Sequence, residues 1–400
     1  MTDMASAMAE NFRVPGWLCR AAGVFFIENL QAADVDDMVV RWKSWYTLYA
    51  SACLLTFGSI NIDFVATNMM RLSPKARTFT KALFIVVPLS VSAKVVTNIF
   101  SAILGSRKMR EFFRNAANHE MQTSFWRQRY RYRSGISYVL RFFMIGAFVG
   151  NVVVTSHMIV STAGFGSNYY LDLLRVTTII GNFFFFFYDM LHSFTLRPCC
   201  EVLIAYVRHQ HAIIRAVVPT ENHAITCPLG MSGVAELHRV KSNLRCVAKL
   251  RELLNDIWQY SLAVSSAAVL IVGCICVYCT FDSGMPLNQI LLTSSYFVYS
   301  AMDFIDVARL SDAMASEVRA LKDTLATASM HRSSAAELRE VAHLYISICP
   351  EDMSLSGGSF FSLDLPLLVS IGGSIITYSV ILVQTSDDVQ HQQVAHTNHT

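Results

Sequence analysis

Seven long apolar segments alternate with polar stretches along the chain. Each has the length that a helix rising about 1.5 Å per residue needs to cross a hydrocarbon layer of about 30 Å. The segments are approximately Trp45–Val65, Ala82–Leu104, Ile136–Thr162, Tyr170–Leu196, Ile257–Phe281, Leu287–Ala308 and Leu365–Gln384. The pattern therefore predicts an all-α membrane protein with seven transmembrane helices.

The last apolar segment has the clearest start. Asp364 can accept from the free amides of the first turn, and Pro366 stands where a missing N–H costs nothing. Small and polar residues interrupt the segment, and on a helix Thr377, Ile381 and Gln384 share one face. Such residues usually face protein or water rather than lipid. The face indicates either a tightly packed helix of the bundle or the lining of an ion pathway.

Three amphipathic stretches lie between the apolar segments. Leucine and valine recur at intervals of three and four from Leu237 to Leu254, opposite a basic face, and no Pro or Gly separates this stretch from the fifth span. We therefore expect one helix that projects beyond the membrane. Similar stripes run from Met314 to Leu325 and from Leu338 to Ile348. Because all three lie on one side of the membrane, they predict a cytosolic helical anchor domain.

These elements divide the chain into seven parts. We expect a cytosolic N-terminal tail, four spans, a cytosolic helical segment, two spans, a second such segment, the seventh span and an extracellular tail. Their boundaries are 1–43, 44–196, 197–256, 257–308, 309–358, 359–385 and 386–400.

Composition supports a polytopic membrane protein. Hydrophobic residues make up 53% of the chain and charged residues 15%, which is too apolar for soluble domains. The net charge of +3 is small and the basic residues are spread over several loops, so nothing favours nucleic acid as a partner. The ten cysteines do not form an extracellular disulfide framework. Cys274, Cys276 and Cys279 lack histidine or acidic neighbours, so no metal or other cofactor is expected.

Basic residues set the expected orientation, because cytoplasmic loops retain Lys and Arg. With the N-terminus inside, 25 of the 32 basic residues fall in cytosolic segments and four in outer ones. Seven spans then place the C-terminus outside the cell. This orientation is the reverse of that in a G-protein-coupled receptor.

The seventh segment also carries a family signature. Thr377-Tyr378, five residues and Gln384 resemble the motif that closes the last helix of insect gustatory receptors, and the run Phe361-Ser-Leu-Asp-Leu365 is similar too. Where the family has Phe after this Gln, the chain has Thr385. The resemblance implies a tastant-gated, non-selective cation channel in the plasma membrane of chemosensory neurons. It also implies a homo- or hetero-tetramer with other gustatory receptor subunits, a pore formed by the seventh helices and a pocket among spans two to six.

Several residues are candidates for the conduction path. The expected pore residues are Thr377, Ile381, Gln384, Thr385, Asp387 and Asp388. Four copies of Asp387 and Asp388 would place eight carboxylates at the outer mouth and favour cations, although two acids in a solvated tail are an equal alternative. Because Thr385 is smaller than Phe, Ile381 is the expected closed constriction.

The ligand pocket is less clearly marked. Polar side chains in the outer halves of spans are costly unless they are used, although each one alone is more often a packing contact. On this basis the candidates for contact with a small-molecule tastant are Asn151, His157, Asp172, Asn182, Tyr278, Tyr296 and Tyr299. Lys94 requires an anionic or carbonyl partner, and Asp303 and Asp306 are expected to be structural.

Three other functions are alternatives to the channel. A seven-span G-protein-coupled receptor of opposite topology is the main alternative, but the chain lacks Asp-Arg-Tyr after the third span and Asn-Pro-x-x-Tyr in the seventh. A transporter predicts internal repeats between halves, and none is detected. An enzyme is not expected, because the sequence has no His-Glu-x-x-His helix, phosphate-binding glycine loop or serine elbow.

Overall fold

The computed structural model is almost entirely helical, which confirms the predicted all-α membrane fold. It describes residues 6–29, 38–70, 78–125, 142–143, 145–153, 156, 169–217, 231–281, 287–330, 335–358 and 360–397. The N-terminal part contains α1 (Ala7–Asn11), α2 (Arg13–Ala21) and the short antiparallel pair β1 (Ile27–Glu28) and β2 (Val39–Val40). The helices that follow are α3 (Trp45–Met70), α4 (Thr78–Leu104), α5 (Ser106–Thr123), α7 (Tyr169–Asp189), α8 (Leu191–Val217), α9 (Met231–Phe281), α10 (Leu287–Met330), α11 (Ala335–Ser347) and α12 (Leu365–Thr397).

Four helices in the described residues are long and apolar enough to cross a membrane, or five if the bent pair α7 and α8 counts as one span. The four lie in α4, α9, α10 and α12. The predicted first span corresponds to α3, and the described residues 142–143, 145–153 and 156 of the predicted third span are helical. The fourth apolar segment is not one straight helix, because α7 and α8 meet at Met190 with a bend of 43°.

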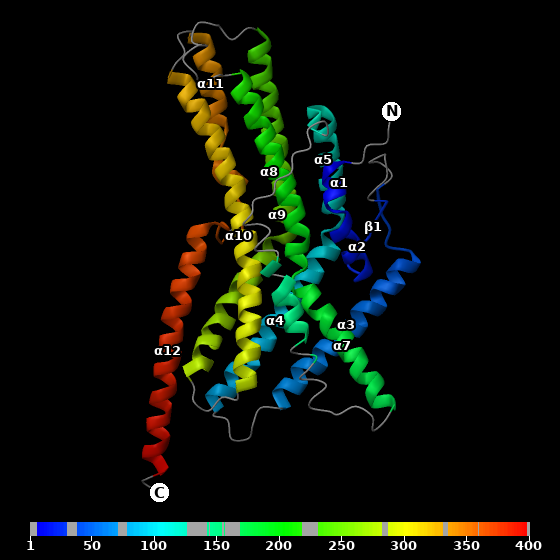
Figure 1. The fold of residues 1–400 in the computed structure, drawn as a ribbon, viewed down its shortest axis with the longest axis vertical. Coiled ribbons are helices and arrows are strands. Elements are labelled where there is room, and N and C mark those ends of the chain that lie inside the picture. Colours follow the sequence, from blue (N-terminus) through cyan, green and yellow to red (C-terminus); the bar gives the residue numbers. More distant parts are fainter. Residues whose placement is uncertain are drawn as a thin grey trace.

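Two of the three amphipathic stretches continue spans, the first as predicted, whereas the third forms the separate helix α11. α9 is a single helix of 51 residues, and α10 extends the sixth span through the Met314–Leu325 stripe over 44 residues. The stripe residues Val247, Leu250, Val318, Leu321 and Val341 are fully buried. Figure 1 shows the ends of α8, α9 and α10 projecting with α11 at one end of the molecule, while the C-terminus lies at the opposite end.

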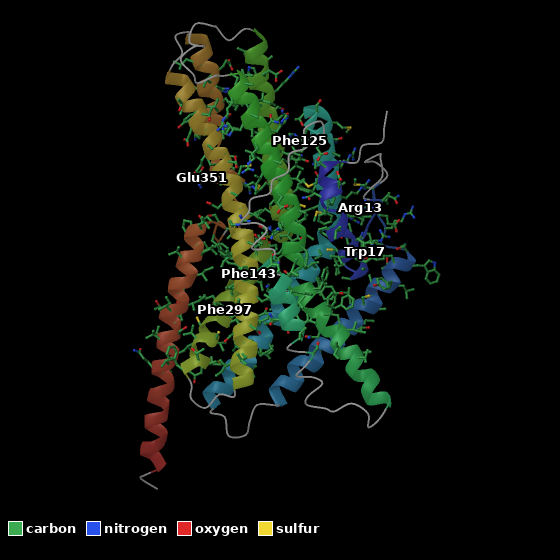
Figure 2. All side chains as sticks on the ribbon, in the orientation of Figure 1. Arg13, Trp17, Phe125, Phe143, Phe297 and Glu351 are labelled. Carbon is green, nitrogen blue, oxygen red and sulfur yellow. The ribbon has the colours of Figure 1, made fainter. Side chains whose placement is uncertain are left out.

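The N-terminal residues pack onto the bundle. The carboxylate of Glu120 on α5 accepts hydrogen bonds from the amides of Ala7 (2.7 Å) and Met8 (3.0 Å), so it caps the first turn of α1. The hydroxyl of Tyr206 on α8 donates to the same carboxylate. On α2, the exposed side chains of Arg13 and Trp17 point away from the bundle (Figure 2). The start of the chain is therefore fixed to α5 and α8.

A buried histidine beside this contact should make the fold acid-sensitive. Burial lowers the pKa of His119 to about 4, and His209 adds to the effect. An unfolded histidine has a pKa of about 6.5, so as pH falls below that value the unfolded chain binds the proton first and stability decreases toward pH 4. We expect His119→Gln to remove a loss of up to about 1.4 kcal/mol per pH unit in this window. Melting temperatures of the purified protein between pH 7 and pH 4.5 measure it.

The matched control is His343→Gln, because His343 is exposed on α11. The control should keep the acid sensitivity of the original protein. If His119→Gln were as acid-sensitive as His343→Gln, the assignment to His119 would be wrong.

Candidate functional site

The start of α12 is fixed by a tight loop over residues 355–363. Leu367 N donates to Asp364 Oδ1 (3.0 Å), which confirms the predicted cap. In the loop, Leu363 N donates to Leu355 O (2.7 Å), and Gly358 has a φ of +67° that favours glycine. A Cβ on Gly357 would lie 2.3 Å from the ring of Phe361. Both glycines therefore permit the turn that leads into α12.

The same loop is attached to the long helices of the anchor domain. Asn255 on α9 donates through Nδ2 to Ser356 Oγ (2.9 Å) and accepts through Oδ1 from Ser356 N (2.8 Å). Ser311 Oγ on α10 accepts from Leu355 N (2.7 Å). A movement of α9 or α10 at this level would therefore be transmitted directly to the base of α12.

One side of α12 packs against α9 through small residues. Ser379 is buried, and its hydroxyl donates to Ile375 O (2.6 Å) and approaches Cys274 O on α9 (3.4 Å). A Cβ on Gly273 would lie 2.7 Å from Ile375 Cδ1 and 2.8 Å from Phe297 Cε2 on α10 (Figure 2). The absence of a side chain at Gly273 lets α12 approach this closely.

The opposite side of α12 is uncovered in the single chain. At 100° per residue, Thr377, Ile381 and Gln384 lie about 160° to 220° around the helix from the face formed by Ile375 and Ser379. All three are exposed, as is Thr385. The hydroxyl of Thr377 bonds within its own helix, whereas the Gln384 amide has no hydrogen-bond partner in the described part of the chain. Asp387 and Asp388 belong to α12, which continues to Thr397, but their side chains lie outside the described residues.

Most of the predicted ligand residues that the structure describes make contacts within the bundle. The amide of Asn151 is paired with Ser295 on α10: its Oδ1 accepts from Ser295 Oγ (3.0 Å), and its Nδ2 donates to Ser295 O (3.3 Å). Tyr278 packs in a small cluster with Ile275 and Cys279, beside α12. His157 and the side chain of Asp172 lie outside the described residues.

Two predicted tyrosines face a buried cluster of charges instead. The Tyr296 hydroxyl donates to Asp189 Oδ1 (3.2 Å), and the Tyr299 hydroxyl donates to Phe186 O (2.9 Å). Asn182 is also buried, and its Nδ2 has no partner among the described residues. Among the predicted ligand residues whose side chains the structure describes, Asn182 thus has a free buried donor.

The charge cluster joins α4, α7, α8 and α10. Lys94 Nζ lies 3.2 Å from Asp189 Oδ1 and 3.6 Å from Asp303 Oδ2, and His192 Nε2 lies 3.2 Å from Asp303 Oδ2. We call these four fully buried residues the quartet. It supplies the anionic partners that Lys94 requires, and it links Asp303 to the bundle as expected. Asp189 and His192 were not predicted as partners, because only the bend brings both onto Lys94 and Asp303.

An asparagine completes the bend between α7 and α8. Asn98 Nδ2 donates to the carbonyls of Tyr188 (3.0 Å) and Asp189 (2.8 Å), which the break frees from the helical pattern. Its Oδ1 accepts from Ser261 Oγ on α9. The Asn98 side chain thus satisfies both carbonyls, which the hydrocarbon core of a membrane would leave without a hydrogen-bond donor.

The fold has known relatives. A family model described as 7tm Chemosensory receptor matches residues 34–388. The solved structure of the insect olfactory receptor OR5 from Machilis hrabei in complex with eugenol is similar, with a TM-score of 0.67 and 13% identity over 94% of this chain and 97% of that one. A second structure of that receptor has a TM-score of 0.65 and 14% identity over the same shares of the two chains. No curated protein matches the sequence.

Replacing Asn98 should destabilise the bend. Asn98→Leu leaves two buried carbonyls without a donor, at a cost of about 1–3 kcal/mol for each. We therefore expect a marked fall in the melting temperature of the purified protein. The control is Thr97→Val, because the half-buried Thr97 bonds only to Ala93 O in its own helix. Equal melting temperatures for the two variants would show that Asn98 does not hold the bend.

Proposed function

The chain belongs to the 7tm chemosensory receptor family, and from this premise we propose that it is a gustatory-type receptor that acts as a tastant-gated, non-selective cation channel. In this proposal four subunits surround a pore formed by their α12 helices. The subunits are copies of this chain or of related gustatory receptors. The receptor resides in the plasma membrane of chemosensory neurons.

The uncovered polar side of α12 is the observation that carries the proposal. In the apolar part of this helix 6% of the residues are buried inside the chain, against 33% to 61% for the other three spans. Lipid offers no hydrogen bond to the Gln384 amide. Glycine, serine and threonine in a span usually face protein or water rather than lipid. Copies of the same helix around a water-filled axis would give these residues both neighbours and solvent.

The residues on this side suit the passage of ions. A ring of Gln384 amides offers dipoles without a fixed charge, which favours weak discrimination among cations. Ile381 lies one turn earlier and would close the pore by excluding water, since Thr385 is small and wettable. Asp387 and Asp388 follow in the same helix and would raise the cation concentration at the mouth.

The arrangement of the chain supports the expected orientation. The anchor helices lie at one end of the molecule and the C-terminal end of α12 at the other (Figure 1). Because 25 of the 32 basic residues belong to the segments on the anchor side, that side is the cytosolic one in this proposal. The C-terminus is then extracellular.

A small organic molecule is the proposed ligand. The structural relative was solved with eugenol, which supports a ligand of this size class for the fold. Asn151, His157, Asp172, Asn182, Tyr278, Tyr296 and Tyr299 remain the proposed contacts. Asn182 is favoured among them, because its buried Nδ2 is available to an acceptor on the ligand. Binding would open the pore only through a higher affinity for the open state.

Cysteine accessibility along α12 tests the pore assignment. We expect Gln384→Cys to let a membrane-impermeant, positively charged thiosulfonate reduce ligand-evoked cation current by at least about half, because the added charge repels cations in the pore. The measurement is whole-cell current before and after external application. The original protein, with its own cysteines, sets the background.

The matched control is Ser379→Cys, a near-isosteric change on the buried side of α12 that faces α9. This variant should behave as the original protein does. If the reagent left the Gln384→Cys current unchanged, or acted equally at both positions, the α12 pore would be refuted.

A further inference from the structure

The quartet is sealed from solvent within the described part of the chain. Lys94, Asp189, His192 and Asp303 are each at most 1% exposed. Their positions follow from four different helices, because the bend after Asp189 turns the start of α8 toward α10. The cluster therefore lies where charge is costly and where any imbalance must be compensated locally.

The fixed charges of the quartet do not balance. Lys94 contributes one positive charge, whereas Asp189 and Asp303 as carboxylates contribute two negative charges. With a neutral His192 the quartet carries one excess negative charge. A buried, uncompensated charge is strongly destabilising, so a folded protein needs one more positive charge at this site.

Neighbouring side chains do not supply that charge. Arg197 on α8 pairs with Asp306 and Glu201, and Arg309 on α10 pairs with Asp306. These two cations and two carboxylates are already balanced. Arg197 also acts electrostatically on Asp303, but when both groups are counted together three cations face four carboxylates, so one excess negative charge remains. The other titratable groups that face the quartet are the phenols of Tyr296 and Tyr299, while α9 contributes no charged side chain to it among the described residues.

The geometry identifies where a proton can be held. Asp189 already accepts from Lys94 and from the Tyr296 hydroxyl, so it is stabilised as a carboxylate. Asp303 Oδ2 faces His192 Nε2 at 3.2 Å, which is hydrogen-bonding distance. Neither atom has a hydrogen-bond partner among the described residues, so each is available to hold a proton. His192 Nδ1 has no other partner among the described residues.

We propose that the quartet is a proton-binding site that holds one exchangeable proton on Asp303 or His192 at neutral pH. The proton makes the site electrically neutral whether it rests on the imidazole or on the carboxyl group. The site connects α4, α7, α8 and α10, so its occupancy is linked to the packing of these helices. This inference rests on charge and geometry alone and does not depend on the proposed channel.

The proposal fixes the direction of a pH effect. In the unfolded chain a histidine and an aspartate together hold one proton until pH rises through the histidine pKa of about 6.5. The folded site keeps its proton above that pH. Stability should therefore decrease as pH rises from about 6.5, by up to tenfold in the folding equilibrium constant per pH unit, until the folded site also releases the proton.

Two Asp→Asn variants, one turn apart on α10, distinguish the quartet from the neighbouring charge group that contains Asp306. Asp303→Asn removes the excess charge, so we expect a melting temperature at pH 7 close to that of the original protein and no decline between pH 6.5 and pH 8.5. Asp306→Asn breaks a balanced group, because it leaves the two cations Arg197 and Arg309 with the single carboxylate of Glu201. We expect it to lower the melting temperature and to keep the decline with pH.

The full-length protein in lipid nanodiscs is the material for these measurements, with sodium chloride and choline chloride compared as salts. The proposal is overturned if Asp303→Asn declines with pH as steeply as the original protein. It is equally overturned if Asp303→Asn destabilises the fold as much as Asp306→Asn. If the original protein were stabilised by sodium and insensitive to pH above 6.5, the missing charge would be a metal cation and not a proton.

Discussion

The close contact between α12 and α9 determines which side of α12 is covered by its own chain and which side stays exposed. Gly273 and Ser379 let the two helices approach without bulky side chains between them, so α12 is held along one narrow side. The residues on its other side, which include Gln384, are exposed in the single chain. Because hydrocarbon cannot satisfy an amide, this exposed side supports the proposed assembly of α12 with its own copies.

The other helices of the bundle form the frame to which α12 is attached along one side. The quartet and Asn98 tie α4, α7, α8 and α10 together inside the membrane, where each unmet polar group is costly. Closer to the end that carries α11, Asn255 and Ser311 connect the long helices to the loop that starts α12. A shift of the frame would reach the base of α12 through hydrogen bonds of about 2.7–2.9 Å. This is a direct route from the bundle to the proposed pore.

Much of this architecture is visible in the sequence because membrane spans have a strong, local signature. The continuity of α9 follows from the lack of Pro and Gly between Leu237 and Ile257, and the start of α12 follows from Asp364. The bend at Met190 could not be predicted, because its cause is Asn98, more than 90 residues earlier in the chain. The partners of Lys94 depend on the same bend. The uncovered side of α12 follows from helical period alone, whereas the paired state of Asn151 required the position of Ser295.

The central claim is that α12 meets its own copies around an axis through the Gln384 face. Pulsed electron paramagnetic resonance measures the distances between subunits directly. The spin labels are attached at Gln384→Cys in the purified protein in nanodiscs. Four-fold symmetry predicts two distances whose ratio is about 1.4, the side and the diagonal of a square. The same label at Ser379→Cys should give longer distances, because that side faces α9. Labels at position 384 that show no coupling between subunits would contradict the account.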